Sequence, residues 1–499
     1  GFSEGSIENH NINNLFQMLA GSFTSFGAAN TNIYGELGPE ATAQTDGPVL
    51  YQHGGTAPLF IEDALGNTLG HGKEQMTDSL AVADLFIHLS PDLQGGDITA
   101  VLDQIKNLIE VSGHNRSLSL ENSATHLGAL LNVDKALLNP ARDSREDLYQ
   151  LIDAIKKSPS FLELQQGGVT FEVLSADAGQ LAGEAKTSDA VRYSLATLTP
   201  FIITGSAADA LYQSHADEIK LFDADLDQGG MTDKYLEDRA KMLAVMIGRN
   251  INDVILAGQT AETYEDLESG NVISNAYMFN RDIDKSQNQQ FIFGNSSNNQ
   301  LFGGDQDDSL YGGEGDDIID GGKGSDYMEG GIGNDTYNAT DGDEILDTDT
   351  KGKVILDGAT LKGGSKEDGS TSWVGADEKT TYSLENGVLT VVTDKSTIKI
   401  HNFESGNLGI DLIDKPDDPL IEQTYSGGTW IEGTSIVRNF VTETLYLDAY
   451  GFTENNDKVE VPESWAGGAI VSLYSGDGDD QLKTANGKET LNGQKGNHI

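Results

Sequence analysis

A run of glycines and carboxylates between residues 294 and 338 has the composition and spacing of a cation-binding segment. Written in nines, it keeps Gly at the first place, Asp or Asn at the sixth and an apolar residue at the eighth through five consecutive nonapeptides. Glycines let such loops adopt positive φ and turn their carbonyls toward one point. Carboxylates add the hard oxygen ligands that Ca²⁺ prefers. The sixth-place residues are Asn299, Asp308, Asp317, Asp326 and Asp335, and the eighth-place residues are Leu301, Leu310, Ile319, Met328 and Tyr337.

We expect this block to bind several Ca²⁺ ions through its sixth-place side chains, together with glycines and third-place acids of the same loops. A flexible, solvated Gly/Asp linker is the alternative interpretation. A linker, however, has no reason to keep an apolar residue at every eighth place. The expected ligands are Asn299, Gly303, Asp305, Asp308, Gly312, Glu314, Asp317, Gly321, Asp326, Gly330 and Asp335.

Two further acidic segments carry weaker signals. The nine-residue pattern restarts near the C-terminus with Asp480 at its sixth place and then degrades. We expect Asp480 to be a metal ligand of a second block. Asp347 and Asp349 follow the last complete nonapeptide, and we expect them in a solvated turn.

The pattern Gly-Gly-x-Gly-x-Asp-x-apolar-x is that of the haemolysin-type calcium-binding repeat of RTX proteins, and the chain resembles secreted RTX exoproteins. The resemblance implies a parallel β-roll with two nonapeptides per coil and loops that alternate between its two sides. Partners on one side would then be two motifs apart, pairing Asp308 with Asp326, and Asp317 with Asn299 and Asp335. The eighth-place residues would stack into a thin core.

The overall composition excludes several classes of function. Asp and Glu total 80 against 31 Lys and Arg, a net charge of −49 that disfavours nucleic acid and anionic membrane surfaces and attracts cations. Cysteine is absent, which excludes disulfides, thiolate metal sites and Cys nucleophiles. No apolar run approaches the roughly 20 residues of a membrane-spanning helix, so we expect no transmembrane segment.

Regular elements are predicted on both sides of the repeats. Apolar residues at helical spacing predict amphipathic helices that begin near residues 98, 144 and 233, the last capped by Thr232 and ending at Gly248. Strands are predicted at 32–34 and 58–62. After residue 340 the pattern predicts a hairpin with an Asn386-Gly387 turn and a further strand at 397–400.

Segments of the first half resemble large RTX exoproteins that carry a class-3-lipase-like domain. The similar segments are 32–43, 58–63, 70–80, 192–201 and 232–240, and residues 342–410 resemble the β region that follows the repeats in such proteins. In those lipases a Ser on a Gly-x-Ser-x-Gly turn attacks the ester, with a carboxylate and a His downstream. The resemblance places His71 at the catalytic His and Glu36 or Glu40 near the acid. An ordinary loop histidine is the alternative for His71.

We expect the Gly-x-Ser-x-Gly turn and its serine nucleophile to lie outside this chain, so that the chain alone hydrolyses no esters. The chain reads as a piece of a longer protein of multidomain α+β class. The expected domains are a partial α/β lipase-like lobe (1–85), a mainly helical domain (86–280), an RTX β-roll (290–340), a β cap (341–415), a β-rich region (420–474) and the start of a second, truncated RTX block (475–499).

The predicted function is that of a calcium-binding, calcium-folded segment of a type I-secreted RTX exoprotein, of the toxin or exoenzyme kind. The expected partners are calcium, the type I secretion apparatus and a host-cell or lipid target, with no nucleic acid. The expected location is extracellular or at the bacterial cell surface. Two alternatives remain open: part of an RTX lipase or phospholipase, and an adhesin or cell-surface-binding module.

Overall fold

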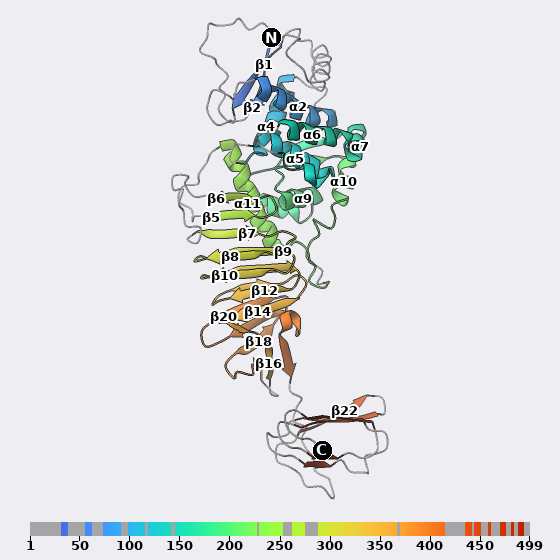
Figure 1. Ribbon diagram of the computed structural model, residues 1–499, viewed down its shortest axis with the longest axis vertical. Coiled ribbons are helices and arrows are strands. Elements are labelled where there is room, and N and C mark those ends of the chain that lie inside the picture. Colours follow the sequence, from blue (N-terminus) through green and yellow to red (C-terminus); the bar gives the residue numbers. More distant parts are fainter. Residues whose placement is uncertain are drawn as a thin grey trace. The chain divides into compact units, whose positions relative to one another are not determined.

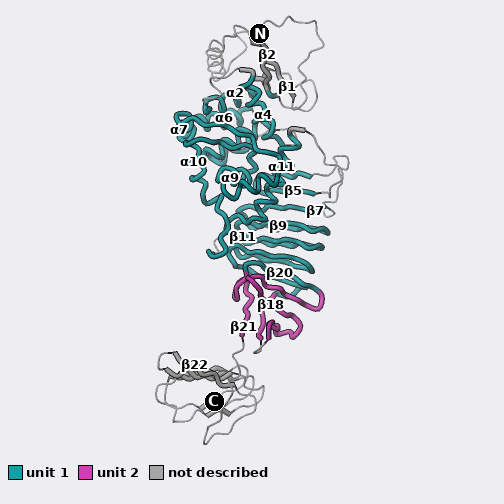
Figure 2. Tube along the Cα trace, turned by 180° about the vertical axis from the view of Figure 1, so that it is seen from behind, with its two compact units in different colours: residues 1–360, 396–402 teal, residues 361–395, 403–499 magenta. Residues whose placement is uncertain are grey.

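The structure is a computed structural model whose chain divides into two compact units (Figures 1 and 2). Unit 1 comprises residues 1–360 and 396–402, and unit 2 comprises residues 361–395 and 403–499. The structure describes residues 31–37, 55–61, 73–90, 98–114, 118–140, 145–226, 229–252, 262–274, 288–366 and 370–414, and the strands 435–441, 444–450, 458–460, 470–475, 481–483 and 488–493.

Helices make up most of the described chain between residues 73 and 252. The predicted helices near 98, 144 and 233 are confirmed, although the third continues through Gly248 to Asn252 because a single helical glycine is tolerated. The helices are α2 (Lys73–Leu89), α4 (Ile98–Val111), α5 (Ser119–Leu130), α6 (Arg145–Lys157), α7 (Pro159–Gly167), α8 (Ala178–Ala185), α9 (Asp189–Thr197), α10 (Ser206–Gln213) and α11 (Asp233–Asn252). No helix of this described part is long and apolar enough to cross a bilayer.

These helices share two apolar cores and two small strand pairs. One core joins α2, α4, α5, α6, α7 and α10, and the other joins α8, α9 and α11 to the first strands of the repeat region. The two strands predicted at 32–34 and 58–62 are confirmed as β1 (Thr31–Leu37) and β2 (Gly55–Ile61), which pair in parallel. The strands β3 (Thr170–Val173) and β4 (Phe201–Thr204) pair antiparallel.

The repeats of unit 1 wind into parallel coils whose strands fall alternately into two sheets (Figure 1). The β8 sheet contains β8 (Gln300–Gly304), β10 (Ile318–Gly322), β12 (Asp335–Ala339), β14 (Gly352–Leu356) and β15 (Ala359–Thr360). The β9 sheet contains, within unit 1, β6 (Asn271–Ser274), β5 (Glu262–Asp266), β7 (Gln289–Phe293), β9 (Ser309–Glu314), β11 (Tyr327–Ile332), β13 (Glu344–Leu346) and β20 (Thr397–His401).

The register of the coils follows the nonapeptide spacing. Ile319 pairs with Leu301 on one side and Tyr337 on the other, and Met328 pairs with Leu310, so strands 18 residues apart are neighbours. All five eighth-place side chains are at most 1% exposed. The predicted roll with two nonapeptides per coil and a thin apolar core is therefore confirmed for these strands.

The described residues of unit 2 lie mainly in strands. The predicted hairpin is confirmed as β18 (Thr381–Glu385) and β19 (Val388–Val392), with positive φ at both Asn386 and Gly387. It extends through β17 (Trp373–Val374) and β16 (Gly363–Lys366) to β21 (Asp411–Asp414). Later strands are β22 (Ser435–Val441), β23 (Thr444–Tyr450), β24 (Lys458–Glu460), β25 (Ile470–Ser475), β26 (Gln481–Lys483) and β27 (Lys488–Gly493).

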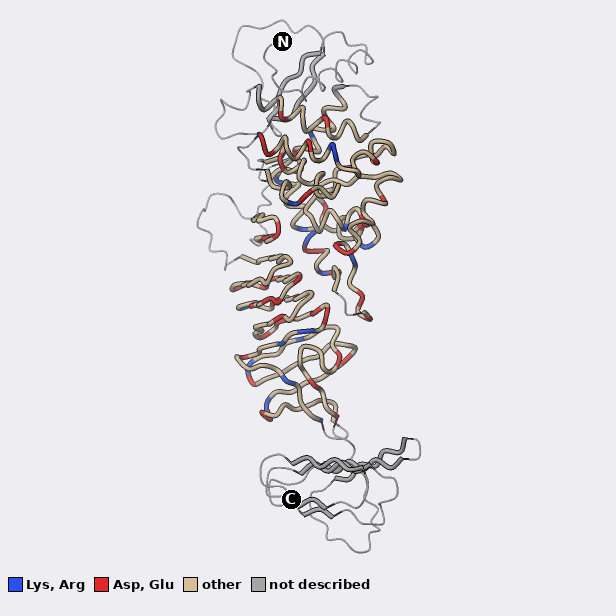
Figure 3. The backbone as a smooth tube through the Cα atoms, turned by 45° about the vertical axis from the view of Figure 1, so that its right-hand side comes forward, with Lys and Arg blue, Asp and Glu red and all other residues tan. Residues whose placement is uncertain are grey.

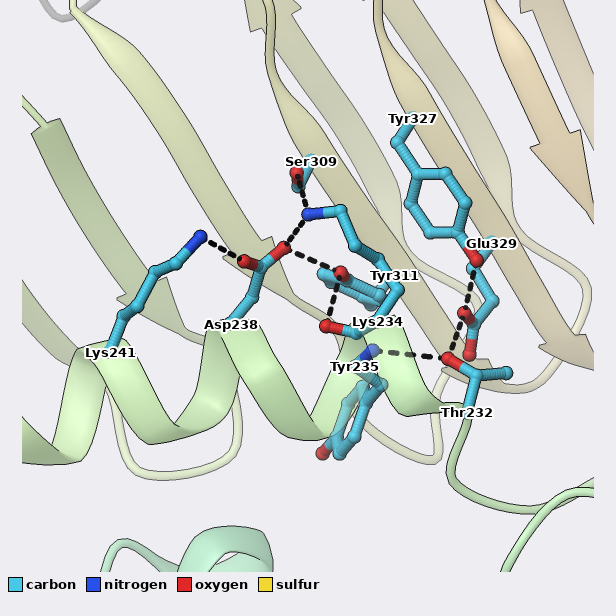
Figure 4. Close-up of polar contacts among 9 residues, drawn as sticks. All are labelled: Thr232, Lys234, Tyr235, Asp238, Lys241, Ser309, Tyr311, Tyr327 and Glu329. Carbon is cyan, nitrogen blue, oxygen red and sulfur yellow. Dashed lines mark hydrogen bonds and ion pairs between the residues drawn. The ribbon is translucent and has the colours of Figure 1, made fainter. Parts of the chain in front are cut away.

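Helix α11 lies on the outer face of the first repeat strands through a buried polar network (Figure 4). Asp238 is fully buried and accepts hydrogen bonds from Tyr311 Oη at 2.7 Å, from Lys241 Nζ at 2.7 Å and from Lys234. Glu329 accepts from Thr232 Oγ1 at 2.7 Å and from Tyr327 Oη at 2.9 Å. The seventh and ninth places of the β9 sheet are thus an interface.

Thr232 also caps α11, as predicted. Its hydroxyl oxygen accepts the Tyr235 N–H at 3.0 Å while its proton goes to Glu329. An aromatic stack continues the interface along the sheet, with Phe293 and Tyr311 parallel at 5.1 Å and Tyr235 packed edge-on against both. The helix therefore supports the coils at their N-terminal end with contacts that need no cation.

The network yields a stability prediction. Asp238→Asn should lower the free energy of unfolding by about 1–3 kcal/mol in calcium, because an amide cannot accept from both lysines and Tyr311 together. Asp153→Asn is the matched control, since Asp153 faces Lys157 at 3.9 Å with both side chains largely exposed. The control should change stability by about 0.5 kcal/mol or less. Urea unfolding followed by circular dichroism measures both, and equal losses in the two variants would contradict the assigned role.

Candidate metal centre

The sixth-place carboxylates form two ladders of hydrogen bonds along the coils. In the first ladder Asp308, Asp326 and Asp343 each accept, at Oδ1, the backbone N–H of the preceding member, starting from Gln290, over 2.7–3.0 Å. In the second, Asp317 and Asp335 accept from Asn299 and Asp317 over 2.6–2.8 Å. We call these the Asp308 column (Gln290, Asp308, Asp326 and Asp343) and the Asp317 column (Asn299, Asp317 and Asp335). The predicted same-side partners are therefore brought together.

The second oxygen of each of four carboxylates lacks a protein partner. Oδ2 of Asp308, Asp317, Asp326 and Asp335 is buried with no hydrogen bond, and the four residues are at most 2% exposed. A buried, unpaired carboxylate oxygen is costly unless a positive group lies against it. Four such oxygens at the expected ligand positions fit a bound cation.

The first-place glycines lie directly against these oxygens. A Cβ built on Gly303, Gly312, Gly321 or Gly330 would collide with Oδ2 of the carboxylate five residues later. At Gly312 it would also collide with the Gly330 carbonyl oxygen, and at Gly303 with the Gly321 carbonyl oxygen. Carbonyl and carboxylate oxygens thus gather beside Gly303 and Gly312, which is the oxygen-rich environment that Ca²⁺ prefers.

Side chains alone do not supply a full set of ligands. Within the residues that the structure describes, no three His, Cys, Asp or Glu side chains converge as a metal cluster. A cation in these loops therefore requires backbone carbonyls beside the carboxylates. Asp and Glu recur along the coils with few Lys or Arg (Figure 3), and residues 303–335 contain ten acidic residues and one lysine.

Both columns begin with a neutral amide. Gln290 stands 18 residues before Asp308, and its side-chain amide donates to the Gly303 carbonyl. Asn299 Oδ1 accepts the Asn295 N–H at 2.9 Å, so this amide is satisfied within its own loop. The Asp308 column ends at Asp343, whose Oδ2 accepts the Thr340 N–H at 2.7 Å. Side-chain amides and backbone N–H groups thus satisfy polar atoms at these ends, and the predicted ligand role of Asn299 stays a prediction.

Burial raises the pKa of every carboxyl in the two columns. The pKa rises to about 7 for Asp308, about 6 for Asp317, about 8 for Asp326 and about 7 for Asp335, in each case chiefly by desolvation. The backbone N–H that each Oδ1 accepts opposes this shift without cancelling it. Protons and calcium therefore compete for the same oxygens near neutral pH.

The remaining predicted site residues behave differently from the sixth-place carboxylates. The Asp305 carboxylate accepts the Lys323 ammonium at 2.8 Å, and Glu314 is exposed, so neither third-place side chain is among the buried oxygens. His71, Glu40 and Asp480 lie outside the described residues, as does the side chain of Glu36. Their predicted roles stay predictions.

The prediction of a solvated turn at Asp347 and Asp349 is wrong. The two residues are 3% and 6% exposed, because the coil continues after the last nonapeptide and folds this loop against it. Asp347 Oδ2 accepts from Tyr337 Oη at 2.8 Å, and Asp349 Oδ2 accepts from Gly333 N at 3.2 Å. The sequence does carry a sign that the coil continues. Asp343 and Ile345 have the residue types of the sixth and eighth places, each one residue earlier than the nonapeptide spacing requires.

Two parts of the sequence match a known repeat family. Residues 293–328 and 311–345, and again residues 472–497, match the RTX calcium-binding nonapeptide repeat (4 copies). The chain carries RTX calcium-binding repeats. The calcium expected from the spacing is thereby supported, and the matched segment 472–497 overlaps the expected second RTX block (475–499).

Other comparisons add little. No curated protein matches the chain. A solved structure that matches is the solution structure of the AlgE6R3 subunit from the Azotobacter vinelandii mannuronan C5-epimerase, with 22% identity, 28% of this chain and 87% of that chain covered, and a TM-score of 0.17. The RTX assignment therefore rests on the repeat match and on the oxygen columns.

One premise of the lipase interpretation needs correction. Residues 1–5 read Gly-Phe-Ser-Glu-Gly, which has the Gly-x-Ser-x-Gly spacing with Ser3 at its centre. The expectation that this spacing lies outside the chain is therefore wrong. These five residues lie outside the described residues, so the structure gives no geometry between Ser3 and His71.

The raised pKa values predict that the metal-free coils are more stable at acid pH than at alkaline pH, the reverse of the usual effect of carboxyl groups. Carboxyls that titrate at about 6–8 when folded and near 3.9 when unfolded bind protons preferentially in the folded state. Their contribution to stability is present in full below about pH 4 and is lost as the pH rises to about 8. In EDTA, urea resistance of the β structure should therefore fall from acid to alkaline pH.

Stabilisation by calcium should change with pH in the opposite direction. Calcium binding expels these protons, so the calcium concentration at the midpoint of folding should fall as the pH rises. Asp326→Asn mimics a protonated Asp326 and should gain stability in EDTA at about pH 8 while losing calcium response. Calcium and urea titrations across this pH range, read by far-ultraviolet circular dichroism, measure both trends. Metal-free stability that rises with pH would show the assigned burial to be wrong.

Proposed function

We propose that this chain is a calcium-folded segment of a type I-secreted RTX exoprotein that works outside the cell or at the bacterial surface. The observation that carries the proposal is the set of four buried carboxylate oxygens with no protein partner, aligned in two columns. Bound Ca²⁺ would supply the positive charge that these oxygens lack. The RTX repeat match supports the same cation.

Folding control is the mechanism that this geometry supports. Each of the strands β8 to β11 contributes only one apolar side chain to the interior of the roll, while the loops between strands concentrate negative charge. Without a cation, the like charges of one column repel each other across a single coil spacing. The carboxylates then favour an extended chain in a calcium-poor cytosol, which suits passage through a narrow export channel, and they order outside the cell where calcium is abundant.

Asp317 and Asp320 should contribute unequally to calcium binding, although they are only three residues apart. Asp317 lies between Asn299 and Asp335 in its column and is 1% exposed, whereas Asp320 occupies a ninth place on the half-buried outer face of β10. Asp317→Asn keeps the hydrogen bond from Asn299 and removes only the charge. It should raise the calcium midpoint of folding about tenfold or more, equivalent to about 1.4 kcal/mol, while Asp320→Asn shifts it less than about twofold.

A calcium titration of the full chain, followed by circular dichroism, tests this ranking. Mg²⁺ should substitute poorly, because it demands a tighter octahedral set of ligands and keeps its waters. Equal midpoints for the two variants would disprove the assigned register. A wild-type β-roll that is fully folded in EDTA at alkaline pH would disprove the calcium mechanism.

A lipase or phospholipase activity is a second proposal, favoured by the Gly-Phe-Ser-Glu-Gly spacing at residues 1–5 and by the resemblance around His71. In this proposal Ser3 is the nucleophile and His71 its general base. It predicts turnover of p-nitrophenyl esters that is lost in both Ser3→Ala and His71→Ala, with Ser6→Ala as a control that retains it. Turnover no greater than that of boiled protein, or equal turnover in all variants, would exclude the activity for this chain.

A further inference from the structure

The two oxygen columns end differently. At the end of the Asp308 column, both oxygens of Asp343 accept backbone N–H groups, from Asp326 at 3.0 Å and Thr340 at 2.7 Å. At the end of the Asp317 column, Asp335 has one satisfied oxygen and one buried oxygen without a partner, and the residue is 0% exposed. Backbone donors therefore satisfy both oxygens of the last carboxylate in the Asp308 column, whereas the last carboxylate in the Asp317 column keeps one oxygen without a donor.

Tyr337 stands where the next coil would supply a carbonyl. Beside Gly312, the place of a Cβ is shared by Asp317 Oδ2 and the Gly330 carbonyl oxygen. Beside Gly330, the same place is shared by Asp335 Oδ2 and the Tyr337 hydroxyl oxygen. Of the five eighth-place residues only Tyr337 carries a hydroxyl. At the end of the Asp317 column, its hydroxyl oxygen takes the position that a backbone carbonyl oxygen has beside Gly312.

The hydroxyl proton of Tyr337 is directed away from Asp335. It is donated to Asp347 Oδ2 at 2.8 Å. The backbone N–H of Gly330 faces the same phenol oxygen. A phenol oxygen has two lone pairs, so one stays available beside Asp335 Oδ2. Asp335 Oδ2 itself is buried without a donor, and a cation lying there would give it a positive partner.

The charges around this point are also unbalanced. Asp335, Asp347 and Asp349 are all buried, and Lys351 Nζ pairs with Asp349 Oδ2 at 2.7 Å. Both oxygens of Asp347 have donors, from Tyr337 Oη and Asp349 N, and both oxygens of Asp349 have donors as well. Asp335 Oδ2 is the remaining oxygen of this group without one.

We propose that Asp335 Oδ2 and the Tyr337 hydroxyl oxygen form a terminal calcium site beyond the nonapeptide motif, with Asp347 orienting the hydroxyl from behind. The repeat match ends at residue 345 and includes neither the Asp347 loop nor a role for Tyr337. A carboxylate that fixes a neutral ligand through its proton is a common second layer of metal sites. The inference rests on the proposed calcium-folded function and adds one ion to the Asp317 column.

The test is the number of calcium ions bound by the full chain, measured by equilibrium dialysis and elemental analysis at about pH 8. Tyr337→Phe keeps the buried ring and removes only the oxygen, and Asp347→Asn keeps an acceptor but removes the charge. Each variant should bind one calcium ion fewer than wild type. Asp320→Asn, on the outer face of the same roll, is the control and should bind the wild-type number.

Terbium luminescence gives an independent readout, because an excited tyrosine transfers energy only to a lanthanide close by. Tb³⁺ added to the wild type should show a tyrosine-sensitised signal that Tyr337→Phe reduces and the control does not. A wild-type calcium number in both Tyr337→Phe and Asp347→Asn would overturn the terminal site and leave the proposed function intact. Absence of calcium binding in the wild type would overturn both. If Asp347→Asn does not fold, the Tyr337→Phe result decides.

Discussion

The roll depends on a carboxylate that is held through one oxygen and left unpaired at the other. In the folded coil, the backbone N–H of the preceding coil fixes Oδ1. The other oxygen is held against its loop by the same fold, so the coil and the cation-binding position form together. Positioning by the fold and affinity for a cation are thus two properties of the same side chain, and the glycines beside it exist to leave room for that oxygen.

The coils differ from a free-standing repeat array because one end is supported. Helix α11 covers the outer face of β7, β9 and β11 with stacked rings and a buried network around Asp238 and Glu329. Both oxygen columns start at this end with amides, Gln290 and Asn299, instead of carboxylates. Neutral groups and a helix therefore stabilise the first coil, where a repeat has no neighbour on one side.

Much of the roll could be predicted from the sequence because its period is regular. The spacing of Asp308, Asp317 and Asp326 fixes their partners, and each eighth-place residue is buried as expected. The α11 interface could not be predicted, since Tyr311 and Glu329 occupy places that the motif leaves variable. Their burial depends on α11 and its capping residue, which lie 73 and 97 residues earlier in the chain. Asp347 was missed because the coil continues where the motif ends, and pattern alone does not report burial there.

The alternation of sides sets a rule for how such a chain can change in length. One coil takes two nonapeptides, and only every second ninth place meets α11, as Tyr311 and Glu329 do. Losing or duplicating a single nonapeptide would exchange the two sheets for every later strand and would misplace the loop that carries Asp347. Losing or duplicating 18 residues would leave every later strand in its original sheet. Such rolls should therefore grow and shrink in evolution by whole coils, with the helix-bound first strands and the closing loop as the invariant ends.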